Sequence, residues 1–110
     1  MVDTVLIVDD SLTVRMDLKE AFEDVGFQTV VCATAAAARQ AFADATVRVV
    51  VLDVLLPDGN GVDLLKEIRA SGDTSGVVVL MLSTEAEVHD RVRGNLRGTA
   101  DRVYRLAFYE

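Results

Sequence analysis

Apolar runs alternate with amphipathic stretches along the whole chain. Short, continuous runs rich in β-branched residues and bounded by turn-forming residues are typical of strands covered on both faces, as in a parallel sheet. Five strands are predicted in this way, the last one weakly: Thr4–Val8, Phe27–Ala33, Arg48–Asp53, Val77–Leu82 and Arg102–Leu106. The central strands of the sheet are therefore expected to be buried.

The stretches between these runs predict amphipathic helices. Ser11 can cap a first helix that ends at Gly26, because apolar residues recur between them every three or four positions. The apolar face of this helix is expected to consist of Val14, Leu18, Ala21, Phe22 and Val25. Three further helices are expected, from Thr34 to about Ala45, from Gly61 to Ala70 and from Thr84 to near Gly98.

The alternation of strands and helices predicts the architecture. Each crossover between neighbouring parallel strands forms a right-handed βαβ unit, so helices cover both faces of the sheet. We expect an α/β fold, a flavodoxin-like doubly wound five-stranded parallel sheet with the strand order 2-1-3-4-5. Its fifth helix is expected to be missing or truncated, which favours a fragment of a longer protein or a partner that covers the same surface.

The composition is that of one globular domain, expected to span residues 1–110. No apolar run approaches the roughly 18 residues that a membrane-spanning helix needs, and Asp3 and Asp9 interrupt the region where a signal peptide would be apolar. We expect a cytoplasmic protein without a membrane partner. Cys32 has no Cys or His nearby at metal-ligand spacing and is expected to fill apolar space.

The formal net charge of −7 is unevenly distributed. From His89 to Glu110 the chain has five arginines and three acidic residues, whereas acidic residues dominate the part before it. Only one aromatic residue, Tyr104, lies among these arginines, and the sequence pI is near 4.6, so direct binding of nucleic acid is not expected. The side formed by the fourth helix and the fifth strand is instead a candidate surface for self-association.

Three aspartates stand at the carboxyl ends of two predicted strands. Asp9 and Asp10 follow the first strand, and Asp53 ends the third. These two strands are neighbours in the expected order, and ligands of such sheets bind beyond the carboxyl ends of the strands. Clustered carboxylates repel one another unless a cation neutralises them. A few hard oxygen ligands supplemented by water suit Mg²⁺, which is the predicted cofactor.

Three segments together resemble the receiver domain of two-component response regulators. They are Ile7–Ser11, Val51–Gly61 and Leu80–Ser83, and the resemblance covers essentially the whole chain. It implies a signalling phosphoacceptor domain of a phosphorelay, from a hybrid histidine kinase or a multidomain regulator. Such a domain is not an enzyme in the usual sense, since it assists its own phosphoryl transfer and dephosphorylation at most.

The resemblance also implies roles for individual residues. Asp53 would accept a phosphoryl group from a histidine kinase or a histidine phosphotransfer domain. Asp9, Asp10 and Asp53 would hold Mg²⁺ together with the backbone carbonyl of Leu55, and Ser83 would hydrogen-bond the phosphoryl group.

The sequence departs from the family at the end of the fifth strand. The family has a lysine followed by a proline there, and this chain has Arg105 and Leu106 or, one residue later, Leu106 and Ala107. Arg105 is a candidate replacement for the lysine, but a planar guanidinium does not substitute freely for a compact ammonium group.

Three other function classes are alternatives to a phosphoryl-accepting receiver. The main alternative is a pseudo-receiver, which would act as a phosphorylation-independent protein-interaction module. A haloacid-dehalogenase-type enzyme needs a second Asp two residues after the acceptor, where this chain has Leu55. A flavin carrier is disfavoured because Asp9 and Asp10 would repel the phosphate of the flavin.

Overall fold

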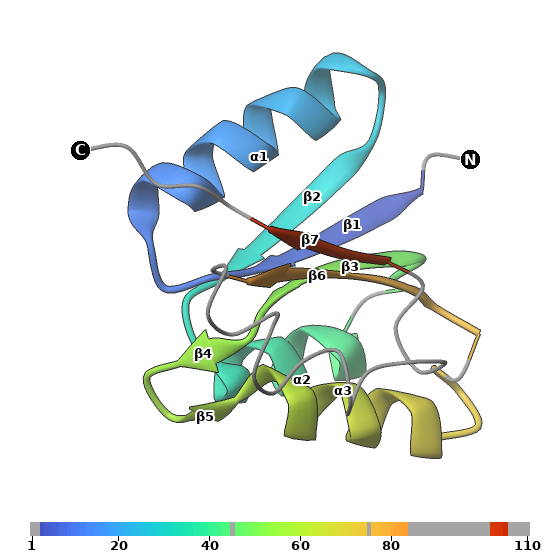
Figure 1. The fold of residues 1–110 in the computed structure, drawn as a ribbon. Coiled ribbons are helices and arrows are strands. Elements are labelled where there is room, and N and C mark those ends of the chain that lie inside the picture. Colours follow the sequence, from blue (N-terminus) through green and yellow to red (C-terminus); the bar gives the residue numbers. More distant parts are fainter. Residues whose placement is uncertain (1–2, 45, 75, 84–101, 106–110) are drawn as a thin grey trace.

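The computed structural model describes residues 3–44, 46–74, 76–83 and 102–105 as strands, helices and their connections (Figure 1). The strands of the main sheet are β1 (Thr4–Val8), β2 (Gln28–Cys32), β3 (Val49–Asp53), β6 (Val78–Ser83) and β7 (Arg102–Arg105). Two short strands, β4 (Leu55–Leu56) and β5 (Gly59–Asn60), form a separate hairpin. The helices are α1 (Leu12–Asp24), α2 (Ala35–Asp44) and α3 (Gly61–Ala70).

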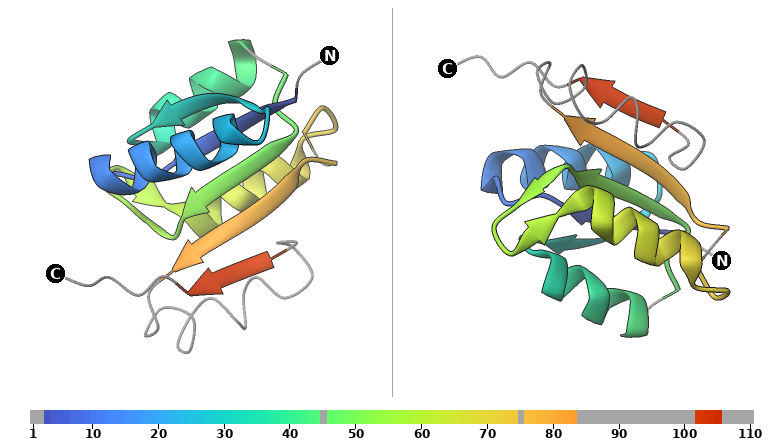
Figure 2. Two further views of the ribbon diagram at one scale, coloured as in Figure 1. Left: turned by 90° about the horizontal axis from the view of Figure 1, so that it is seen from above. Right: turned by 60° about the horizontal axis from the view of Figure 1, so that its bottom comes forward.

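The main sheet is parallel, and its strand order is β2-β1-β3-β6-β7. This order confirms the predicted doubly wound topology, with β1 and β3 side by side at the centre. Helix α1 covers one face of the sheet, and α2 and α3 cover the other (Figures 1 and 2). The carboxyl ends of β1 and β3 therefore lie at one edge of a three-layer sandwich.

Two apolar cores fill the space between the layers. The larger core packs β1, β3 and β6 against α2 and α3, and includes Leu6, Leu52, Leu65 and Met81. The smaller core lies under α1, where Val5, Ile7, Val51 and Leu82 are buried. Neighbouring residues of one strand enter opposite cores because side chains alternate between the two faces of a sheet.

The bounds of the main-sheet strands and of α1 to α3 agree with the sequence predictions to within one or two residues, and α3 has the predicted bounds, whereas the β4–β5 hairpin was not predicted. One prediction about α1 is wrong: Val25 is 71% exposed, because α1 ends at Asp24 and Gly26, with φ of 100°, turns the chain toward β2. Ala21 is also exposed, whereas Val14, Leu18 and Phe22 pack against the smaller core as expected.

Some predictions fall outside the described part of the chain. The predicted fourth helix and the absent or truncated fifth helix lie there, as does the helical part of the expected self-association surface. In the described ranges, no helix combines the length and the apolar character that crossing a membrane would require.

Candidate functional site

Asp9, Asp10 and Asp53 converge at the carboxyl ends of β1 and β3. Each offers one carboxylate oxygen, and these oxygens lie within 4.8 Å of one another. Strand β1 delivers Asp9 and Asp10 to this edge, and β3 delivers Asp53 as its last residue. The parallel register, which pairs Val8 with Leu52, brings the two strand ends level. We call these three residues the acidic trio.

Asp9 is the buried member of the trio, with only 3% of its surface exposed. Its backbone N–H donates to the carbonyl of Cys32, and its carboxylate accepts a hydrogen bond from the Ser11 N–H at 2.8 Å. Burial raises the pKa of the Asp9 carboxyl, and the negative charge of Asp10 raises it further. The hydrogen bond from Ser11 and the positive charge of Arg15 lower the pKa but offset only part of this rise. The folded chain thus holds a carboxylate that would be more stable with a cation nearby.

Arg15 is the cation that the structure places beside Asp9. Its Nη1 atom donates to the Asp9 backbone carbonyl at 2.9 Å, one helical turn beyond the acidic pair. The sequence analysis did not single out this residue. A basic residue one turn into the helix after a strand-tip Asp pair is the only sequence signal that could have pointed to it.

Asp53 is held by the segment that follows it. Its Oδ1 atom accepts a hydrogen bond from the Leu55 N–H at 3.3 Å. A Cβ atom on Gly61 would lie 2.0 Å from the Asp53 backbone oxygen, so this close approach of α3 to β3 requires glycine. The Gly61 N–H donates to the Val54 carbonyl at 2.7 Å. Helix α3 and the phosphoacceptor candidate therefore have a fixed relative position.

Residues 54–60, which we call the acceptor loop, form the β4–β5 hairpin between Asp53 and α3. Asn60 caps α3 by accepting a hydrogen bond from the Val62 N–H at 2.7 Å. Asp58 accepts hydrogen bonds from the first two amides of α2, those of Ala35 and Ala36. The sequence analysis missed Asp58 because its partners lie more than twenty residues earlier in the chain.

The remaining predicted site residues lie along the same edge. Strands β6 and β7 pair Ser83 with Arg105, and β3 and β6 pair Asp53 with Leu82. Ser83 therefore ends the strand next to Asp53, and Arg105 ends the strand beyond it. Leu55 follows Asp53 by two residues and has 55% of its surface exposed.

The donor set of the trio matches a hard divalent cation. Three carboxylates supply only oxygen ligands, which favours Mg²⁺ or Ca²⁺ over a metal that prefers nitrogen or sulfur. A compact site with few protein ligands is typical of Mg²⁺, which keeps several waters. The residues present therefore fit the predicted cofactor.

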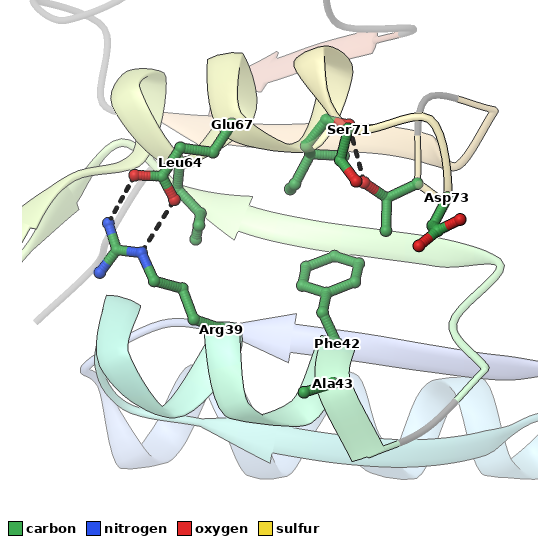
Figure 3. Close-up of a pocket in the computed structure, with 9 residues that line it drawn as sticks. Arg39, Phe42, Ala43, Leu64, Glu67, Ser71 and Asp73 are labelled. Atoms are coloured by element: carbon green, nitrogen blue, oxygen red, sulfur yellow. Dashed lines mark hydrogen bonds and ion pairs between the residues drawn. The ribbon is translucent and has the colours of Figure 1, made fainter.

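A cavity of about 240 Å³ lies elsewhere, between α2 and α3 (Figure 3). The Phe42 ring points into it, and the guanidinium of Arg39 forms two hydrogen bonds with the carboxylate of Glu67 across it. None of its nine lining residues belongs to the acidic trio. Since it contains none of the residues suited to phosphoryl chemistry, we place the functional site at the trio.

Comparison with known proteins identifies the family of the chain. Residues 5–104 match the family described as the response regulator receiver domain. The chain belongs to this family. Receiver domains are signalling domains of two-component systems, and the acidic trio lies on the segments that carry the resemblance noted in the sequence.

Curated relatives agree with this assignment. The chain is 37% identical over 102 residues to the regulatory protein AtoC of Escherichia coli, which corresponds to 93% of this chain and 22% of AtoC. The chain spans from about a fifth to less than half of the length of the curated relatives considered, among them transcriptional regulatory proteins.

Solved structures confirm the fold. The chemotaxis protein CheY4 of Vibrio cholerae has a TM-score of 0.88 at 24% identity, with 99% of this chain and 90% of that chain covered. The response regulator TrrA of Thermotoga maritima, solved in complex with Mg²⁺ and a beryllium fluoride, has a TM-score of 0.79 at 23% identity, with 96% and 88% covered.

Proposed function

We propose that this receiver domain accepts a phosphoryl group on Asp53 from the phosphohistidine of a histidine kinase or a histidine phosphotransfer domain, with Mg²⁺ bound at the acidic trio. The observation that carries this proposal is the convergence of three carboxylates within 4.8 Å at one edge of the sheet. Without a bound cation, the mutual repulsion of these three carboxylates would only destabilise the fold.

The proposed chemistry is a phosphoryl transfer from nitrogen to oxygen. A bond forms between phosphorus and a carboxylate oxygen of Asp53 as the P–N bond of phosphohistidine breaks, and the imidazole keeps the electron pair. When bound, Mg²⁺ would neutralise charge on the phosphoryl oxygens, which is the main requirement of such a transfer. Asp9 and Asp10 would hold the ion with Asp53 and the Leu55 carbonyl.

Exposed apolar residues beside the site support a protein as the phosphodonor. Leu12 and Met16 are one turn apart on α1, directly after the acidic pair, and are 64% and 52% exposed. Leu55, two residues after Asp53, is similarly exposed. Apolar side chains around a charged centre are typical of protein interaction sites.

The test is phosphoryl uptake from a small donor. The chain would be incubated with acetyl phosphate, with and without Mg²⁺, and its intact mass followed over time. We expect a Mg²⁺-dependent mass gain of one phosphoryl group in the original chain and no gain in Asp53→Asn.

A matched control is Asp63→Asn, which removes one exposed carboxylate from the first turn of α3. This variant should be phosphorylated like the original chain. Absence of any Mg²⁺-dependent gain in the original chain would reject the proposal and favour a pseudo-receiver. The same experiment with Arg105→Met tests whether Arg105 replaces the family lysine, and with Ser83→Ala whether the hydroxyl contributes.

A further inference from the structure

Asp58 lies at the turn of the β4–β5 hairpin, five residues after Asp53. The hairpin pairs Leu55 with Asn60 and Leu56 with Gly59, so Asp58 is at its tip and Leu55 at its base. Leu55 contributes the N–H that donates to the Asp53 carboxylate. The position of the hairpin therefore determines the position of the backbone next to the acceptor.

The Asp58 carboxylate binds the start of a helix from a different part of the chain. Oδ1 accepts from the Ala35 N–H at 2.8 Å, and Oδ2 accepts from the Ala36 N–H at 3.0 Å. A negative charge is stabilised at this end of a helix by the free amides and by the helix dipole. The hydrogen bonds from the backbone amides of Ala35 and Ala36 hold the pKa of the Asp58 carboxyl below its usual range, so the group stays ionised near neutral pH.

Helix α2 also has a cap of its own. The Thr34 hydroxyl oxygen accepts a hydrogen bond from the Ala37 N–H at 3.1 Å. The first three amides of α2 are therefore all hydrogen-bonded, two of them to Asp58 and the third to Thr34. Among the residues that the structure describes, Asp58 alone connects those amides to the acceptor loop.

We propose that Asp58 is a positioning residue for phosphoryl transfer: it anchors the β4–β5 hairpin to the N-terminus of α2 and so fixes the Leu55 backbone beside Asp53. This inference rests on the proposed function of Asp53. The hairpin is held at its other end by Asn60 and Gly61, which bind α3 and Val54. Without Asp58, the tip of the hairpin loses its attachment to α2.

The test compares Asp58→Ala with Thr34→Ala. Both variants remove an acceptor from the first turn of α2, but only Asp58→Ala releases the hairpin. Mg²⁺ affinity would be measured by titration of backbone amide resonances, and phosphorylation by acetyl phosphate would be followed by intact mass. Hydrogen exchange of the Leu55 and Gly61 amides would report on the hairpin itself.

We expect Asp58→Ala to bind Mg²⁺ about tenfold more weakly, as is usual when a residue that supports metal ligands is removed. Its phosphorylation should slow, and its Leu55 amide should exchange faster. Thr34→Ala should match the original chain in all three measurements. Asp58→Asn keeps one acceptor oxygen and should recover part of the Mg²⁺ affinity.

Equal Mg²⁺ affinity and phosphorylation in Asp58→Ala and Thr34→Ala would overturn the inference. If the original chain binds Mg²⁺ but takes up no phosphoryl group, the proposed function of Asp53 fails. The Mg²⁺ affinities of Asp58→Ala and Thr34→Ala then decide whether Asp58 positions the hairpin. If the original chain binds no Mg²⁺, both proposals are wrong. Asp58→Asn keeps the comparison decisive if Asp58→Ala does not fold.

Discussion

Asp9 illustrates how a single residue can combine a proposed role in metal binding with a cost in stability. Its carboxylate is almost completely buried, beside the carboxylates of Asp10 and Asp53. Arg15 offsets part of this charge, but it donates its hydrogen bond to the Asp9 carbonyl and not to a carboxylate. The metal-free domain therefore contains unfavourable electrostatic energy that a bound cation would relieve.

The variant Asp9→Asn should be more stable than the original chain in Mg²⁺-free buffer. Removal of a buried charge from the trio should raise the free energy of unfolding by about 1 kcal/mol, measured by urea denaturation. Asp17→Asn, which removes an exposed carboxylate from α1, is the matched control and should change little. A loss of stability in Asp9→Asn would show that repulsion in the trio is not significant.

Gly61 permits the close approach of α3 to Asp53. In Gly61→Ala, the new Cβ would overlap the Asp53 backbone oxygen, so either β3 or α3 must move. We expect a loss of about 1–3 kcal/mol of stability, as is typical of overpacking, together with slower phosphorylation. Gly59→Ala is the control, since a Cβ there meets no atom within 4 Å. Equal losses in the two variants would contradict this account.

At the scale of elements, the acceptor loop is attached to the starts of two helices. Asp58 binds the first amides of α2, and Asn60 caps α3. Both attachments use amides that a helix leaves without intrahelical partners. The loop is therefore ordered by its neighbours as well as by its own hairpin.

The Asp58 attachment should make stability depend on pH at the acidic end. The folded-state pKa of Asp58 is lowered, first by the amide of Ala35 and next by that of Ala36. Its contribution is therefore complete above the ordinary Asp pKa of 3.8 and is lost as the pH falls through the lower folded-state value. Thermal melts at decreasing pH should show a smaller acid-induced loss in Asp58→Asn. Parallel curves for the two proteins would disprove this linkage.

At the scale of the whole molecule, the two faces of the sheet differ in how completely their helices are buried. Helix α3 buries Leu64, Leu65 and Ile68 in the larger core, whereas α1 has no fully buried residue among those described. The apolar residues of α1, such as Leu18 and Phe22, are only partly covered. The larger core is therefore expected to supply most of the stability.

Truncation of one leucine on each face tests this difference. Leu65→Ala should lower the free energy of unfolding by about 2–5 kcal/mol, the range typical of a fully buried leucine. Leu18→Ala should cost clearly less, because its side chain is already partly exposed. Urea denaturation of both variants would measure the difference, and equal losses would contradict the partial exposure of Leu18 on α1.

Much of this architecture could be predicted because it depends on patterns that are local in sequence. Continuous apolar runs predicted the parallel strands, and their alternation with helices predicted the strand order. The same reasoning placed Asp9, Asp10 and Asp53 at one edge of the sheet. Val25 was assigned to the wrong environment because helical spacing continued into a residue that follows the last turn of α1.

What the sequence determined by itself was the strands of the main sheet, the helices α1 to α3, the order of the strands and the three carboxylates of the trio, since these follow from periodicity and from the rules of parallel βαβ folds. Only the tertiary structure decided what surrounds the trio: the hydrogen bond from Arg15, the close approach of Gly61 and the binding of Asp58 to α2. The last two join residues on different elements, and the bond from Arg15 depends on the orientation of its side chain. Such contacts exist only after the sheet and helices have packed, which is why the pattern of hydrophobic and polar residues did not predict them.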